Sequence, residues 1–272
     1  GTDAMAGVLY FSDVRPLETG NSNNINLFGG TNGSPLSAQY DYHKSGNGVY
    51  YAGGYFAANP EYIDGNGDTV HGSHSQTASV RVLSKFKTGE SNHRLKTSLV
   101  VRTLGMPEGG HDHEDEPGDE PGHEEEEHGD QQLRNVNISW ESDRKLGSWV
   151  LRNVTGLQSV SRAEFDEHHE DEDEPGDEPG HEEEGPHIGF NLISATQTTS
   201  IQKVISDNGL LTLGAQQQFR SLQNMADAEE ILYPNKSQFQ SALFAHISKT
   251  RGKNMTSAGL RGETGSFSGA SF

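Results

Sequence analysis

The sequence predicts an all-β protein, an antiparallel up-and-down transmembrane β-barrel. Apolar and polar residues alternate over segments of about ten residues, the period of a strand whose two faces meet different surroundings. The connections between these segments are alternately short and long, as in bacterial outer-membrane barrels. No apolar run approaches the roughly 18 residues of a transmembrane helix, which excludes such helices without bearing on a barrel. A soluble barrel or sandwich is the alternative fold.

Eleven strands can be placed from Asn23 onward, and no segment has the periodicity of a helix. Their expected bounds are 23–30, 35–43, 49–56, 77–87, 93–104, 132–141, 148–162, 188–198, 210–222, 237–249 and 255–265. An odd number of antiparallel strands does not close in the usual single-chain bacterial barrel. We therefore expect the chain to be incomplete.

Each predicted strand has one apolar and one polar face. In the segment 93–104, for example, Leu95 and Leu99 fall on one face, and Arg94 and Lys96 fall on the other. Side chains alternate across a strand, so such a segment can place its apolar side against lipid or a core and its polar side against water. The length of the strands, their many glycines and the recurring Tyr and Trp favour the membrane.

The connections alternate in length along the chain. Short turns are expected at about 44–48, 88–92, 142–147, 206–209 and 250–254, and long connections at 57–76, 105–131, 163–187 and 223–236. In an up-and-down sheet every second connection emerges at the same end. All the long connections should therefore lie on one side.

Two of the long connections contain the same string, DEPGDEPGHEEE, at 115–126 and again at 173–184. We call the segments 105–131 and 163–187 the acidic loops. Such segments bury almost no apolar surface, and their like charges repel. Their Pro-Gly pairs also set turns. From composition we expect both to be mobile.

The net charge of −20 belongs to these loops rather than to the whole chain. Residues 111–130 and 164–184 hold 24 of the 40 acidic residues, which leaves 16 acids against 20 Lys and Arg elsewhere. The body is nearly neutral, so the overall charge indicates no macromolecular partner, and no nucleic acid is expected. The local field of the loops should attract cations.

The acidic loops place imidazole beside carboxylate at high density, a ligand set that suits Zn²⁺ and neighbouring divalent metals. The chain has no cysteine, so thiolate ligands are excluded. A plain solvated acidic insertion is the alternative, but His adds little charge at neutral pH and is the commonest metal ligand. The candidate ligands are His111, His113, Glu114, Asp115, His123, His128, His168, His169, His181 and His187, with His71 and His74 from another long connection.

Other polar residues have simpler explanations. Asp64, Asn66 and Asp68 resemble the first half of a calcium-binding loop, but the distal bidentate Glu is missing, so we expect an ordinary turn. His43, His93 and His246 lie in or beside strands and should be lumen-facing or interfacial. Nothing in the spacing indicates catalysis or a catalytic cofactor.

Several motifs resemble TonB-dependent outer-membrane receptors. The segment 1–9, GTDAMAGVL, resembles the end of their plug domain, and 258–263, AGLRGE, after 242–245, ALFA, resembles their mid-barrel strands. The segments 74–77, HSQT, and 105–107, GMP, resemble the zinc-uptake receptors of the ZnuD type.

This resemblance implies the first half of a 22-stranded barrel with a plugged lumen. Residues 1–22 would be the end of the plug and its link, and 23–272 half of the barrel. The implied location is the outer membrane of a Gram-negative bacterium, in contact with its lipid and with the His-rich loops extracellular. The implied activity is zinc uptake, energised by the TonB-ExbB-ExbD complex through the plug.

Two other functions remain open from the sequence. A receptor of the same fold could take up haem, for which His is an axial ligand. A secreted all-β protein could instead buffer metal or act as an adhesin without transporting anything.

Overall fold

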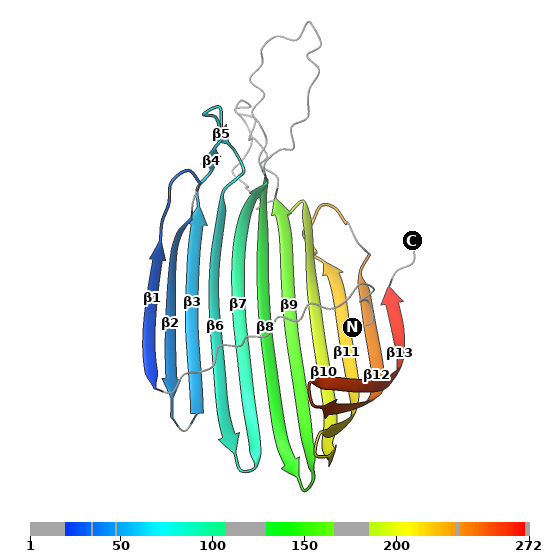
Figure 1. The fold of residues 1–272 in the computed structure, drawn as a ribbon. Coiled ribbons are helices and arrows are strands. Elements are labelled where there is room, and N and C mark those ends of the chain that lie inside the picture. The colour runs from blue at the N-terminus through cyan, green and yellow to red at the C-terminus, as the bar shows by residue number, and fades with distance from the viewer. Residues whose placement is uncertain are drawn as a thin grey trace, which may run out of the picture.

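The computed structural model describes residues 20–33, 35–46, 48–106, 129–165, 185–231 and 234–269. Eleven strands form one antiparallel sheet, and each lies beside its neighbours in chain order, except that a small hairpin is inserted after the third (Figure 1). In this part of the chain, no helix is long and apolar enough to cross a membrane.

The strands of the large sheet are long. They are β1 (Asn21–Phe28), β2 (Leu36–Ser45), β3 (Gly48–Asn59), β6 (Ser75–Thr88), β7 (Ser91–Met106), β8 (Gly129–Leu146), β9 (Trp149–Phe165), β10 (Ile188–Ser206), β11 (Gly209–Asn224), β12 (Lys236–Arg251) and β13 (Asn254–Gly269). The inserted hairpin consists of β4 (Tyr62–Ile63) and β5 (Thr69–Val70).

The all-β antiparallel fold and the eleven large strands are confirmed, although most strands extend beyond their expected bounds; β8, for example, runs to Leu146 rather than ending at 141. The β4–β5 hairpin was missed, because two-residue strands carry no periodic signal. Strand β10 continues to Ser206 rather than ending at 198. Its second half, 199–206, is rich in polar residues, but ladders to β9 and β11 on both sides hold it extended.

The alternation of connection lengths is also confirmed. Two residues join β6 to β7, β8 to β9, β10 to β11 and β12 to β13, whereas the long connections all emerge at the opposite end of the sheet (Figure 1). Gly89, Gly147 and Gly252 begin three of the short turns with φ of 57°, 62° and 63°. Glycine adopts this left-handed conformation without steric cost, which suits two-residue hairpin turns.

The sheet has one apolar and one polar face. The apolar face is the more exposed and the polar face the more buried, which is the reverse of the arrangement in a soluble protein. A cross-strand row on the apolar face runs through Ile25, Tyr40, Val80, Leu99 and Val136. These side chains are exposed, from 37% for Val136 to 71% for Ile25.

On the polar face, by contrast, Asp41 is only 6% exposed and His43 only 9%. Tyr51 donates a hydrogen bond to Asp41 Oδ1, and Gln39 donates one to Asp41 Oδ2 at 2.7 Å. Burial of this carboxylate is therefore compensated by hydrogen bonds, as burial of a polar group requires.

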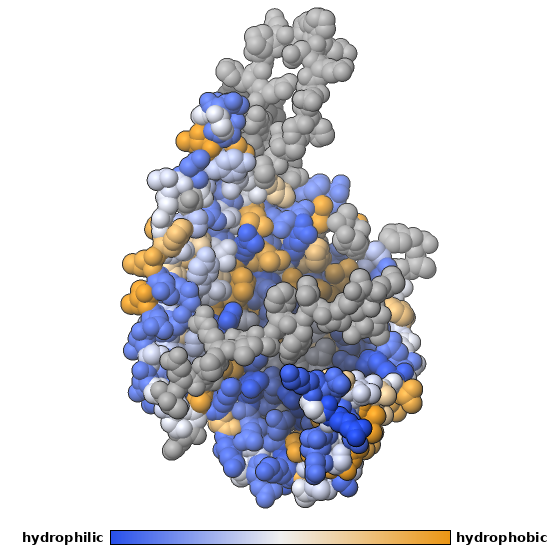
Figure 2. All heavy atoms as spheres, in the orientation of Figure 1, coloured by the Kyte–Doolittle hydropathy of each residue, from blue (hydrophilic) through white to orange (hydrophobic). Residues whose placement is uncertain are grey.

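No second layer covers either face within the described residues, and their only buried hydrophobic residues are Ala57, Ala163 and Ala242. Figure 2 shows hydrophilic residues across the lower part of the face in view and hydrophobic ones along both lateral margins. The sheet is thus held together mainly by its interstrand ladders and cross-strand side-chain pairs.

Aromatic residues gather on the apolar face near the short turns. His93 stacks between Phe86 and Trp140, with centroid distances of 5.0 and 6.0 Å. Nearby in the sheet, Lys203 lies over Trp149 at 5.3 Å, a cation–π contact. His93 is therefore on the apolar face of the sheet, beside aromatic rings, and not on the polar face.

Glycine at position 214 leaves room for an aromatic ring, which gives a stability prediction. A Cβ there would lie 2.8 Å from both Phe244 Cε1 and the Thr199 carbonyl oxygen, whereas a Cβ on Gly262 would meet nothing within 4 Å. Gly214→Ala should destabilise the sheet by about 1–3 kcal/mol, and Gly262→Ala much less. Thermal unfolding in detergent measures both. Equal melting temperatures would show that Phe244 moves aside freely.

Candidate functional site at the rim of the sheet

The long connections rise from a level line of residues at one end of the sheet. Ser75, Leu104, Gln131, Glu164 and Ile188 pair in succession across five strands, β6 to β10. We call the described residues beyond this line, together with the connections at the same end, the rim. The rim is where the sequence-predicted metal ligands are expected to gather.

The connection 60–74 folds into the β4–β5 hairpin, which is fixed to the neighbouring connection. Asn32 donates to the Ile63 carbonyl at 3.1 Å and accepts from the Ile63 amide at 2.7 Å, so its side chain pairs with the hairpin as a strand would. Ser73 accepts from the Tyr62 amide at 3.1 Å. These contacts reverse the chain and bring its two ends together.

The tip of the hairpin is the turn expected at Asp64. Oδ1 of Asp64 accepts from the backbone amides of Asn66, Gly67 and Asp68 at 2.7, 2.9 and 3.0 Å. The hydrogen bond from the Asp68 amide, followed by that from Asn66, holds the pKa of the Asp64 carboxyl below its usual value. These bonds account for the conformation of the turn.

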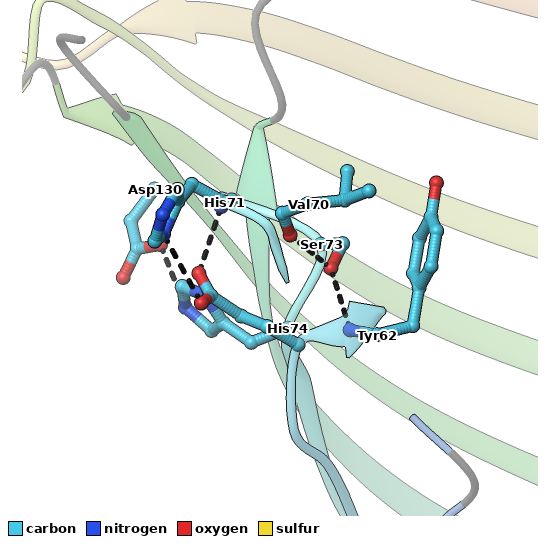
Figure 3. Close-up of polar contacts among 8 residues, drawn as sticks. Tyr62, Val70, His71, Ser73, His74 and Asp130 are labelled. Carbon is cyan, nitrogen blue, oxygen red and sulfur yellow. Dashed lines mark hydrogen bonds and ion pairs between the residues drawn. The ribbon is translucent and has the colours of Figure 1, made fainter. Parts of the chain in front are cut away.

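Below the turn, one carboxylate contacts two imidazoles. Oε2 of Glu61 lies 3.3 Å from His71 Nδ1, and Oε1 lies 3.9 Å from His74 Nδ1. Nε2 of His74 lies 3.1 Å from Oδ1 of Asp130, at the start of β8 (Figure 3). We call Glu61, His71, His74 and Asp130 the Glu61 cluster.

Two glycines allow this arrangement. Gly72 has a φ of 68° and donates its amide to Glu61 Oε1 at 2.9 Å, which fixes the carboxylate between the rings. Gly105, near the end of β7, donates to the His74 carbonyl at 3.0 Å. A Cβ on Gly105 would lie 2.7 Å from the Gly72 carbonyl carbon, so only glycine lets the connection lie this close to β7.

The Glu61 cluster has the donors of a metal site but is arranged as a set of ion pairs. Donors on one tetrahedral Zn²⁺ are about 3.4 Å apart, given bonds of roughly 2.0–2.1 Å. The Glu61–His71 separation of 3.3 Å is near that value, whereas the Glu61–His74 separation of 3.9 Å is longer. Within the described residues, however, no three His, Asp or Glu side chains are already placed around a common ion position.

A second cluster forms where the chain returns to the sheet at β10. Nδ1 of His187 lies 3.4 Å from Glu229 Oε2, and Nε2 lies 3.6 Å from Glu230 Oε2. The Glu230 amide donates to the His187 carbonyl at 2.8 Å, so the connection 225–231 lies along this segment. The two carboxylates occupy opposite nitrogens of one ring and therefore do not form a single chelate in this conformation.

The two clusters bracket the acidic loops. His74 directly precedes Ser75 of β6, and His187 directly precedes Ile188 of β10, on the same level line. Four interstrand spacings of about 4.8 Å place these strands roughly 19 Å apart. The connections 107–128 and 166–187 leave the sheet between them.

Nine of the twelve predicted ligands lie outside the described residues, namely His111, His113, Glu114, Asp115, His123, His128, His168, His169 and His181. His71 and His74 both contact Glu61, whereas His187 contacts Glu229 and Glu230 in the second cluster. Sequence reasoning missed Glu61, Asp130, Glu229 and Glu230. The available signal was their position in long connections, which for Glu61 and Asp130 already held a candidate His.

Comparison with known proteins adds a distant fold similarity. No family model matches the chain, and no curated protein matches it. Among solved structures, the copper transporter OprC is similar, with a TM-score of 0.43 and 11% sequence identity. The match covers 89% of this chain and 45% of that one, so this chain spans less than half the length of the transporter.

The Asp64 turn gives a local prediction. Because the pKa of Asp64 is lowered, its ionised carboxylate stabilises the turn at pH values above the ordinary pKa of 3.8. This stabilisation is lost as the pH falls through the lower pKa of the folded state. Asp64→Ala should speed amide exchange of Asn66, Gly67 and Asp68, and Asp68→Ala should not. Exchange measured by NMR at neutral pH separates the variants. Equal rates in both would mean that the backbone alone sets the turn.

Proposed function

We propose that this chain is part of an outer-membrane receptor barrel that takes up a divalent metal ion, with zinc as its cargo. The observation that carries the proposal is the Glu61 cluster, in which a carboxylate fixed by a backbone amide lies between two imidazoles. It stands at the rim, beside the point where the first acidic loop returns to the sheet. Capture of the ion at this rim would be the first step of uptake.

The exposed apolar face supports a place in the membrane. Leu99, Leu157 and Ile193 are 42–49% exposed on a single-layer sheet that offers them no core. A contiguous apolar surface of this kind is unfavourable in water but is the normal outer surface of a transmembrane barrel. The aromatic stack around His93 fits the aromatic girdle found at a membrane interface.

The chemistry of the donors supports a divalent metal of intermediate softness. Neutral imidazole and carboxylate suit Zn²⁺, and a chain without cysteine offers no thiolate. Binding of an ion at this cluster would require Glu61 and the two rings to turn from their ion-pair arrangement toward a common position. The same donors bind Cu²⁺ more tightly by the general affinity order of divalent metals, so selectivity has to be tested against it.

The family resemblance of the sequence supports the energetic part of the proposal. Uptake against a gradient needs a source of energy, which the TonB-ExbB-ExbD complex would supply through a plug domain whose end is the segment 1–9. These residues lie outside the described part of the chain. The metal-capture step at the rim does not depend on this coupling.

The first test is calorimetry with Zn²⁺ on the chain in detergent. His71→Ala/His74→Ala should remove one site from the isotherm, while His246→Ala, a strand histidine away from the rim, should leave the isotherm unchanged. Glu61→Gln keeps the shape but loses the charge, and should weaken that site about tenfold or more. A parent chain that binds neither Zn²⁺ nor Cu²⁺ would refute the metal function.

Acidity should weaken capture, because imidazole binds metal only when neutral and titrates between roughly pH 5 and 8. Zinc affinity of the chain should therefore fall between about pH 7.5 and pH 5.5. Removing the histidines of both acidic loops together with His71 and His74 should flatten most of that dependence. An affinity that stays constant over this range would assign capture to the carboxylates alone.

The proposed membrane orientation can be tested in cells. A protease site inserted at Asp227, in a long connection, should be cleaved from outside intact cells. Sites at Gly89 and Asn208, in short turns at the other end, should be cleaved only after the outer membrane is opened. Cleavage of all three sites in intact cells would place both ends of the sheet on one side and exclude a membrane-spanning barrel.

A further inference from the structure

A cavity lies on the polar face of the sheet, near the rim and away from the Glu61 cluster. It spans β10 to β13, has a volume of about 520 Å³, and is lined by Leu192, Leu222, Phe267, Arg220, Lys236 and Gln238 among others. Ligand pockets commonly fall between about 300 and 1,000 Å³. This cavity is therefore large enough for a small organic molecule.

The sheet register explains why these side chains converge. Leu192 pairs with Leu222, which pairs with Lys236, and in the next row on the same face Arg220 pairs with Gln238. Phe267 pairs with Gln238 from the other side. Apolar and cationic side chains thus share one patch on a face that is otherwise lined mainly by polar residues.

The two cations stand on neighbouring strands in a diagonal relation, a spacing of about 7–8 Å between backbones. Among the described residues, neither Arg220 nor Lys236 forms an ion pair, and no lining residue is acidic. Two positive charges this close repel each other, and an anion bound between them would replace that repulsion with attraction.

Gln218 orients the arginine. The donors and acceptors around Gln218 assign its amide oxygen to the side of Arg220, where it accepts from Nε at 3.2 Å and from Nη2 at 3.0 Å, while its nitrogen donates to Gln240 at 3.2 Å. An amide fixes the guanidinium without neutralising it, and the contact leaves Nη1 out. A carboxylate or phosphate oxygen is the natural partner for such a group.

We propose that this cavity binds an organic anion with an apolar body, whose acidic head pairs with Arg220 and Lys236 and whose body packs on Leu192, Leu222 and Phe267. The head is a carboxylate or a phosphate, since both satisfy the same two cations. This site is independent of metal capture at the rim. It gives the receptor a second ligand class on the face that would line the lumen.

The test uses the chain in a neutral detergent and four probes, 1-naphthoate, 1-naphthyl phosphate, 1-naphthalenemethanol and acetate, followed by ligand-observed NMR. Naphthoate or naphthyl phosphate should bind, and the stronger of the two identifies the head group. The neutral alcohol and acetate should each bind at least about tenfold more weakly, because each lacks one half of the ligand.

Variants then locate the site. Arg220→Gln/Lys236→Gln should lower affinity for the aromatic anion by about tenfold or more. Lys249→Gln, on β12 near its short turn, should have no effect. Phe267→Ala should weaken the anion and the alcohol alike, which a purely electrostatic site would not do. Circular dichroism checks that each variant keeps its strands.

Equal affinity for the anion in the parent and the double variant would overturn the proposal, as would equal affinity for naphthoate and the alcohol. If the double variant loses its strands, the single variants Lys236→Gln and Gln218→Ala replace it, with the same expected direction. Unchanged affinity in both would also overturn the proposal. None of these outcomes depends on whether the chain binds zinc.

Discussion

The interstrand main-chain hydrogen bond is the interaction on which this structure depends. The described residues form a single layer with only three buried apolar residues, all alanine, so no packed core assembles the strands. Each strand is instead placed by its ladder to the next. The position of every functional side chain, including those at the rim, therefore follows from register.

Register also decides which residues face which surroundings. Because side chains alternate with a period of two, a slip of one residue would move every side chain of a strand to the opposite face. A slip of this kind would exchange the surroundings of Tyr40, which is 46% exposed on the apolar face, with those of Asp41, which is 6% exposed on the polar face. Because the two faces differ this much in exposure, the register is strongly specified.

The sequence predicted the sheet well because both of its signals are local. Alternation within 93–104 and the lengths of the connections can be read without knowing any contact, and they yield eleven strands with the long connections at one end. The extension of β10 to Ser206 could not be read this way, because the ladders on both sides hold residues whose own pattern is weak.

The candidate site was less predictable, because its contacts join residues from different connections. Glu61 meets His71 only because the segment between them turns back, and that reversal is held by Asn32 from another connection. Asp130 meets His74 because β7 and β8 carry the chain through a ladder in which Gly105 faces Asp130. Neither contact has a fixed spacing that sequence inspection could recognise, although the residue types indicated the chemistry.

The ladder also has a consequence for the acidic repeats. Each acidic loop leaves and re-enters the sheet at paired residues, Gly105 with Asp130 and Glu164 with Ile188, and both pairs are fixed by strands that continue below. The cost of closing a loop rises by only about 0.6 kcal/mol for each doubling of its length. The chain could therefore gain or lose DEPG units, which already stand in tandem at 115–122 and 173–180. The number of carboxylates displayed by the protein could thus change between strains or over generations while every strand stays in place.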